Sequence, residues 1–243
     1  MSITASSEQQ RQLLDLQSLD TQLTRVRTQL NAIRHDDQLK QLRHDGATAV
    51  QHANTMKAQV DEHQFAVQQA EHVVTETTKR RNALQARLDA DDVSSRDIQA
   101  VTTEIAELTM RIEQLEDDQF AAMQTLEESQ QAMEKAQANV TEAEQAVNVR
   151  ITTLNEQGQQ LSKQGKELTA ERAAIAKELP ADLVTEYEQM RDQNQGIGAM
   201  ELRPDGLSGA GLPIAPAELA AINNTPANEL AYCPDTGAIL VRN

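Results

Sequence analysis

Residues 88–97, with the sequence LDADDVSSRD, separate two long stretches of helical repeat. On both sides of them, apolar residues recur in alternating steps of three and four, the spacing of a supercoiling helix. The aspartates and serines within the stretch can accept hydrogen bonds from the free amides of a new helix. Acidic Asp97 then falls in the first turn, where the helix dipole favours it. We therefore predict a turn near residues 89–95, between two helices.

The helical repeat falls into three arms, from Leu13 to Ile33, from Leu39 to Leu88 and from Val101 to Leu179. Two long arms joined by a short turn predict an antiparallel coiled-coil hairpin. An extended parallel dimer, and with it a homo-oligomer, is the rival arrangement that the repeat leaves open. Because the third arm is much longer than the second, we expect the first arm to cover its C-terminal half.

The composition favours long helices over a thick globular core. The 243 residues include no Trp, two Tyr and two Phe, and large rings supply much of the buried area in compact domains. The formal net charge is -16. Most of it falls between residues 89 and 200, which hold 9 basic and 23 acidic side chains. A mildly basic second arm beside a strongly acidic third arm agrees with their pairing.

Most of the prolines and glycines lie after residue 195, which marks a second, small domain. Within it we expect short strands at 199–203 and 211–214, one or two helical turns at 216–222, and a hairpin over 229–241. The predicted fold class is mainly α. Residues 1–195 form the helical coiled-coil hairpin and residues 196–243 form a small α+β domain.

Six stretches, in this order, resemble a bacterial family in which a long helical hairpin precedes a small C4 zinc ribbon, described as zinc-ribbon or nucleic-acid-binding proteins. The stretches are LLDLQSLDTQL (13–23), VSSRDIQAVTTEIAEL (93–108), LPADLVTEYEQMR (179–191), GIGAMEL (196–202), IAPAELAAI (214–222) and CPDTGAILVR (233–242). The resemblance implies a zinc-ribbon-like fold for the C-terminal domain. Relatives of that family resemble chaperones or adaptors of secretion assemblies, so an adaptor role is also implied.

The resemblance places the four zinc ligands of the family at Leu207, Ala210, Cys233 and Thr236. Leucine, alanine and threonine do not supply the thiolate or imidazole that structural zinc needs. All five histidines lie at residues 35–72, far from these positions in the chain. We therefore expect a degenerate zinc site with no metal and no other cofactor. Apolar packing must then hold the domain, through Leu202, Leu207, Leu212, Ile214, Leu219, Ile222, Leu230, Tyr232, Ile239 and Leu240.

No catalytic residue emerges from the sequence, and we expect no enzyme. Adjacent acidic pairs such as Glu127 and Glu128 point in different directions on a helix and cannot jointly flank a substrate. His63 falls on the predicted helical seam, where a partly buried spacer is the simpler interpretation. Cys233 has no base or cation beside it in the chain, which favours an inert thiol.

Direct nucleic-acid binding is disfavoured by the charge of the C-terminal domain. Residues 201–243 hold 2 basic and 5 acidic side chains, with Tyr232 their only aromatic residue. The basic run Lys79–Arg81 lies mid-helix, where pairing with the acidic arm explains it. The sequence thus favours a coiled-coil adaptor or scaffold that binds unidentified protein partners. The alternative is a nucleic-acid-binding regulator that acts through the ribbon-like domain.

No apolar run reaches the roughly 20 residues of a membrane span, and the N-terminal residues lack a basic start and an apolar segment. We therefore expect a cytoplasmic protein without a membrane partner.

Overall fold

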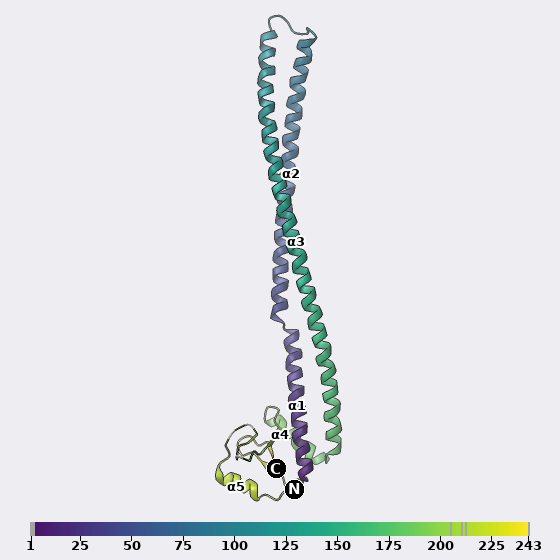
Figure 1. Cartoon of the computed structure of the whole chain (residues 1–243), viewed down its shortest axis with the longest axis vertical. Helices are drawn as coiled ribbons and strands as arrows, with labels where there is room; N and C mark the ends of the chain where they lie inside the picture. Colours follow the sequence, from purple (N-terminus) through teal and green to yellow (C-terminus); the bar gives the residue numbers. More distant parts are fainter. Residues whose placement is uncertain (1–2, 205, 210, 212, 243) are drawn as a thin grey trace. The chain divides into compact units, whose positions relative to one another are not determined.

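The computed structural model describes residues 3–204, 206–209, 211 and 213–242, and the described chain is mainly helical (Figure 1). Its elements are α1 (Ser7–Arg34), α2 (Asp37–Asp89), α3 (Ile98–Glu178), α4 (Ala181–Gln193), β1 (Ala199–Glu201), α5 (Pro216–Asn224), β2 (Ala231–Tyr232) and β3 (Ile239–Val241). The long helical hairpin is thus present, as predicted, and the C-terminal residues form a small sheet of three strands.

The helix ends follow the local sequence. At the start of α1, Ser6 and Gln9 form a capping box, in which each side chain accepts a hydrogen bond from the other residue's backbone amide. Between α2 and α3 the chain turns over residues 90–97, and Asp91 takes a positive φ of 55°. The Asp97 amide then donates to the Ser94 carbonyl at 2.8 Å. The chain thus turns close to the predicted residues 89–95, but α3 begins only at Ile98, so Asp97 precedes the first turn of the helix and does not lie in it as expected.

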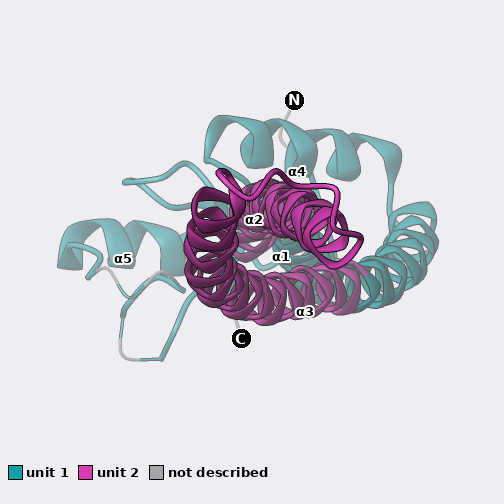
Figure 2. Ribbon diagram, turned by 90° about the horizontal axis from the view of Figure 1, so that it is seen from above, with its two compact units in different colours: residues 1–36, 152–243 teal, residues 37–151 magenta. Residues whose placement is uncertain are grey.

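The residue contacts divide the chain into two compact units (Figure 2). Unit 1 holds residues 1–36 and 152–243, and unit 2 holds residues 37–151. The division predicted at residue 195 rests on composition rather than on contacts, and it stays a prediction.

Unit 2 consists of α2 and the first part of α3, which run side by side in opposite directions (Figure 1). Their seam is largely half-buried, and its buried apolar residues are Val67, Ile112, Leu115, Ala136 and Val140. Two helices alone bury one stripe each, so this partial burial is what a two-helix coiled coil allows. The chain therefore folds back on itself.

Charge pairing between the two arms is sparser than their opposite composition suggested. Arg80 binds Glu104 of the facing arm at 2.6 Å, which confirms the prediction for one member of the basic run. Lys79 instead binds Glu76 on its own helix. Adjacent residues on a helix point in different directions, so a basic run cannot face one partner as a block.

In unit 1, α1 covers the C-terminal part of α3, as the lengths of the arms predicted. The buried residues of this contact are Leu19, Leu23, Val26 and Leu168, with Leu30, Leu161 and Ile175 packed around them. Gly165 contributes to the close fit, because a Cβ at that position would lie 3.4 Å from the Val26 side chain.

The sheet has the strand order β1-β3-β2. β1 is parallel to β3, and β2 is antiparallel to β3 through the predicted hairpin. The helix expected at 216–222 is α5. Of the strand expected at 211–214, the described residues Gly211, Pro213 and Ile214 form no strand, and Leu212 lies outside the described residues. Within its described residues, only an isolated bridge joins Pro213 to Leu207, because proline has no amide to donate to a ladder.

Two buried apolar clusters support the sheet from within unit 1. One joins the sheet to the helices, and its residues are Ala5, Leu13, Leu16, Leu179, Leu183, Tyr187, Ala199, Leu230 and Ile239. The other belongs to the C-terminal residues alone and holds Met200, Leu202, Ile214, Ile222, Ala231, Cys233, Ala238 and Leu240. The sheet therefore borders two apolar cores. One is formed by the C-terminal residues alone, and the other is shared with α1, α3 and α4.

Candidate functional site

Three of the positions that the resemblance assigned to zinc lie within the described residues, in or beside turns. Cys233 is buried at 2% exposure in the C-terminal cluster, and its amide donates to the Ala238 carbonyl at 2.8 Å. The Thr236 hydroxyl accepts a hydrogen bond from the Ala238 amide at 3.3 Å. Leu207 is half-buried, and its carbonyl accepts from the Arg203 amide. Ala210 lies outside the described residues.

These side chains do not fit a zinc ion. Cys233 offers one thiol among apolar neighbours, while Leu207 offers carbon and Thr236 a hydroxyl that already serves the turn. In the part of the chain that the structure describes, no three His, Cys, Asp or Glu side chains are grouped as a metal site. The turns at Leu207 and at Cys233–Thr236 are held by backbone hydrogen bonds and by packing.

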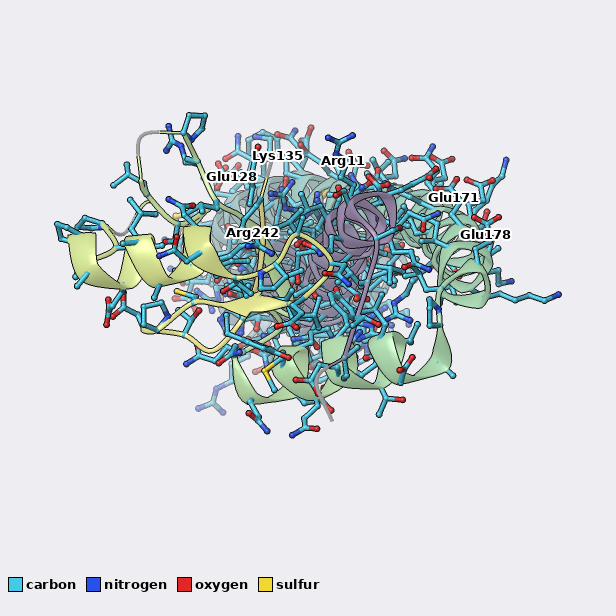
Figure 3. The ribbon with its side chains drawn as sticks, turned by 90° about the horizontal axis from the view of Figure 1, so that it is seen from below. Arg11, Glu128, Lys135, Glu171, Glu178 and Arg242 are labelled. Carbon is cyan, nitrogen blue, oxygen red and sulfur yellow. The ribbon has the colours of Figure 1, made fainter. Side chains whose placement is uncertain are left out.

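Arg242 fastens the C-terminal residues together in a way that the sequence did not predict (Figure 3). Its Nη1 donates to the carbonyls of Ile222 and Thr225, at 2.9 and 2.6 Å. Its Nη2 donates to those of Pro226 and Glu229, at 2.9 and 2.8 Å. One guanidinium thus binds four carbonyls at and beyond the end of α5. The fork ties α5 and the following loop to β3.

A closed ring of four charged side chains joins three helices of unit 1. Asp20 of α1 binds Arg172 of α3 at 2.7 Å and Arg191 of α4 at 3.0 Å. Glu188 of α4 binds the same two arginines, with 2.9 Å to Arg191. Each carboxylate has two arginine partners and each arginine two carboxylates, so the charges of the ring cancel. The ring fixes α4 against α1 and α3.

Tyr187 adds a buried hydroxyl to this ring, and the ring shifts the pKa values of its members. The Tyr187 hydroxyl donates to Asp20 Oδ2 at 2.8 Å. Burial would raise the pKa of Asp20, but hydrogen bonds from Arg172, Tyr187 and Arg191 outweigh it and lower that pKa. Burial and the hydrogen bond to Asp20 raise the pKa of Tyr187. In β2, burial and a hydrogen bond to Glu186 raise the pKa of Tyr232 to about 12.

Gln17 of α1 sets the position of β1. Its Oε1 accepts from the amides of Gly198 and Ala199, at 2.7 and 3.3 Å, and its Nε2 donates to the Gly196 carbonyl at 2.9 Å. Gly198 must be glycine, because a Cβ there would lie 2.6 Å from the ring of Tyr187. The sequence did not predict this role for Gln17, because a polar residue within a helical repeat looks like any other surface residue.

A groove of about 460 Å³ lies between α1 and the edge strand β1. Polar α1 residues form one wall, and β1 with its flanking residues forms the other. The lining residues are Leu14, Gln17, Ser18, Thr21, Gln22, Arg25, Ile197, Ala199, Met200, Glu201 and Gly209. The groove combines an apolar floor with a mixed polar rim, and it is the candidate binding site of unit 1.

The remaining sequence candidates are not among the residues that line this groove. His63 lies on the seam of unit 2, partly buried, and its Nδ1 has no hydrogen-bond partner among the described residues. The acidic pair Glu127 and Glu128 is exposed on α3. None of the helices within the described ranges is long and apolar enough to traverse a bilayer.

The helical hairpin and the small sheet packed on it define a coiled-coil hairpin protein with a C-terminal β module. Residues 16–195 match the model of the CT398-like coiled coil hairpin domain, and the chain belongs to this family. No curated protein matches the chain.

Three solved structures share the fold. A structure from Mycobacterium smegmatis has 21% identity and a TM-score of 0.65, covering 99% of this chain and 100% of its own. CT398 from Chlamydia trachomatis has 14% identity and a TM-score of 0.61, with 97% and 98% covered. The HP0958 protein from Helicobacter pylori has 12% identity and a TM-score of 0.50, with 98% and 99% covered. At these identities the likeness concerns the fold.

Proposed function

We propose that this chain is a non-enzymatic, cytoplasmic adaptor that binds partner proteins through the groove between α1 and β1. The observation that carries the proposal is the groove itself, which is about 460 Å³ in volume and has an edge strand as one wall. A segment of a partner can lie in this groove and bind through side-chain contacts, since the Gly198 and Ala199 amides of the strand edge already donate to Gln17. Arg25, exposed on the α1 wall, can bind an acidic group of the partner.

We interpret the C-terminal module as a degenerate zinc ribbon that supports this groove. Two observations support this interpretation. Turns lie at the described positions to which the resemblance assigns zinc ligands, and Cys233 is the one cysteine ligand of the family that this sequence keeps. The Arg242 fork and the apolar cluster of the module take over the holding role that zinc has in the family.

The test blocks the groove on α1. Ser18 is an exposed residue of the groove wall, and Ser18→Trp places a large ring in the groove. Thr28→Trp is the matched control, since Thr28 is exposed on the same helix but does not line this groove. Tagged wild type and both variants are used for affinity capture from native lysate, followed by quantitative mass spectrometry.

Proteins retained by wild type and Thr28→Trp but lost with Ser18→Trp are the expected result. Equal capture by all three forms contradicts the groove as the binding surface. The alternative regulator is tested in parallel by titrating binding to random DNA and RNA against salt. A steep fall of log affinity with log salt would favour nucleic-acid binding and overturn the adaptor proposal.

A further inference from the structure

An exposed stripe of acidic and apolar side chains runs along α3 in unit 2. Glu113, Glu116, Phe120, Met123 and Glu127 follow one another in steps of three, four, three and four, so they share one face of the helix. All five are exposed, with Phe120 at 61% and Met123 at 50%. These five residues are called the 113–127 stripe. Its spacing is that of a coiled-coil seam with no helix on it among the described residues of unit 2.

The stripe lies in the most acidic part of the chain. Between Arg111 and Lys135 there are no Lys or Arg residues and seven carboxylates, Glu113, Glu116, Asp117, Asp118, Glu127, Glu128 and Glu134. Within the described residues, none of these seven forms an ion pair. The two large apolar side chains are therefore surrounded by uncompensated negative charge.

The seam of unit 2 does not use these residues. Ile112 and Leu115 are the buried α3 positions at this level, and Phe120 is set well away from their direction on the helix. A single exposed apolar residue is ordinary on a protein surface. An adjacent pair at i and i+3, with carboxylates on both sides along the same stripe, matches the anchor spacing of helix-on-helix recognition.

We propose that the 113–127 stripe binds a basic amphipathic helix of a partner protein. Apolar side chains of that helix cover Phe120 and Met123, and its Lys or Arg residues bind Glu113, Glu116 and Glu127. Charge complementarity selects this partner, because an acidic helix would be repelled by the seven carboxylates. The proposal concerns a second surface and goes beyond the groove of unit 1.

A second copy of this chain does not supply such a helix. Its basic run Lys79–Arg81 lies on α2, where Leu84 and the other apolar repeat residues already face the seam. Arg80 and Lys79 are also bound, to Glu104 and Glu76. The basic run of a second copy is therefore not available to the stripe, and we take the partner to be a different protein.

The test measures peptide binding to the full chain by isothermal titration calorimetry at about 0.15 M ionic strength, where weak surface charge effects are screened. The probe is a synthetic helix of about five turns, with leucines on one face and lysines on the flanks. The control peptide has the same composition in scrambled order, so its leucines share no face. We expect the amphipathic peptide to bind at least about tenfold more tightly than the scrambled one.

Matched variants locate the site. Phe120→Ser combined with Met123→Ser should weaken binding about tenfold, since truncated anchors dominate such interfaces. Phe65→Ser is the control, because Phe65 on α2 is also exposed at 61%. The affinity of this variant for the amphipathic peptide should stay within about twofold of wild type. Circular dichroism checks that each variant keeps its helices.

Three results would overturn the proposal. They are no binding of the amphipathic peptide to wild type, equal binding of the scrambled peptide, and a loss with Phe65→Ser as large as with the double variant. Ser18→Trp in the groove should leave peptide affinity unchanged, so this inference and the proposed function can fail separately.

Discussion

Unit 1 and unit 2 bury their apolar residues to very different extents. In unit 1, Leu13, Leu16, Leu183 and Ile239 are fully buried, because α1, α3, α4 and the sheet surround them. In unit 2, two helices face only one another, and most seam positions stay half-buried. The same kind of repeat therefore produces a closed core where three or more elements meet and an open seam where only two do.

The difference in packing between the two units can be tested by truncating one leucine in each. Leu183→Ala should destabilise unit 1 by about 4 kcal/mol, since its neighbours cannot collapse into the cavity. Leu84→Ala, at a half-buried seam position of α2, should cost about 1 to 2 kcal/mol. Urea denaturation gives both values, with tyrosine fluorescence reporting on unit 1, which holds both tyrosines, and circular dichroism on all helices. Equal costs would contradict the difference in packing.

The second test removes a charge from the ring in unit 1. Asp20→Asn leaves Arg172 and Arg191 short of a carboxylate and should cost about 3 kcal/mol. Asp15→Asn, at an exposed position of the same helix, should cost less than about 0.5 kcal/mol.

The same ring predicts a dependence of stability on pH. The pKa of Asp20 is lowered on folding from its ordinary value of 3.8, so its contribution is present above that value. It is lost as pH falls through the lower, folded pKa. The free energy of unfolding, measured by urea denaturation from pH 5 to pH 2, should fall more steeply for wild type than for Asp20→Asn. Parallel curves would show that Asp20 is not the titrating group.

The third test concerns the C-terminal fork. Arg242→Lys keeps the charge but cannot reach four carbonyls from one planar group, and it should cost about 2 kcal/mol. Arg11→Lys, at an exposed position of α1, is the control (Figure 3). Hydrogen exchange should rise in residues 216–229 for the first variant alone. Unchanged exchange there would mean that packing holds α5 without the fork.

The smallest expected effect is that of a chelator. Leu207 and Thr236 cannot ligate zinc, and the apolar cluster stabilises the module in its place. EDTA should therefore leave the thermal unfolding midpoint, followed by tyrosine fluorescence, unchanged. Elemental analysis of the purified protein provides the check. Stoichiometric zinc, or a midpoint that drops with EDTA, would refute the zinc-free account of the module.

The helical part of the fold could be predicted because its signal is local. Steps of three and four along the chain predict a helix and its buried stripe directly, and the turn at 90–97 coincides with the residues where this spacing is interrupted by aspartates and serines. The pairing of α1 with the end of α3 followed from arm length alone. The candidate site could not be predicted in the same way. Gln17 and Arg242 resemble many other polar residues, and their roles depend on carbonyls and amides far away in the chain.

By itself, the sequence determined three long helical arms, the turn that folds two of them together, and a C-terminal module without a zinc ligand set. These features depend on short-range spacing and on which atoms each side chain carries. Only the tertiary structure decided that a four-membered charge ring fixes α4 and that one arginine holds the end of α5. It also decided that a groove forms beside β1. Such features arise when distant segments meet, because a hydrogen bond or a groove requires both partners in place.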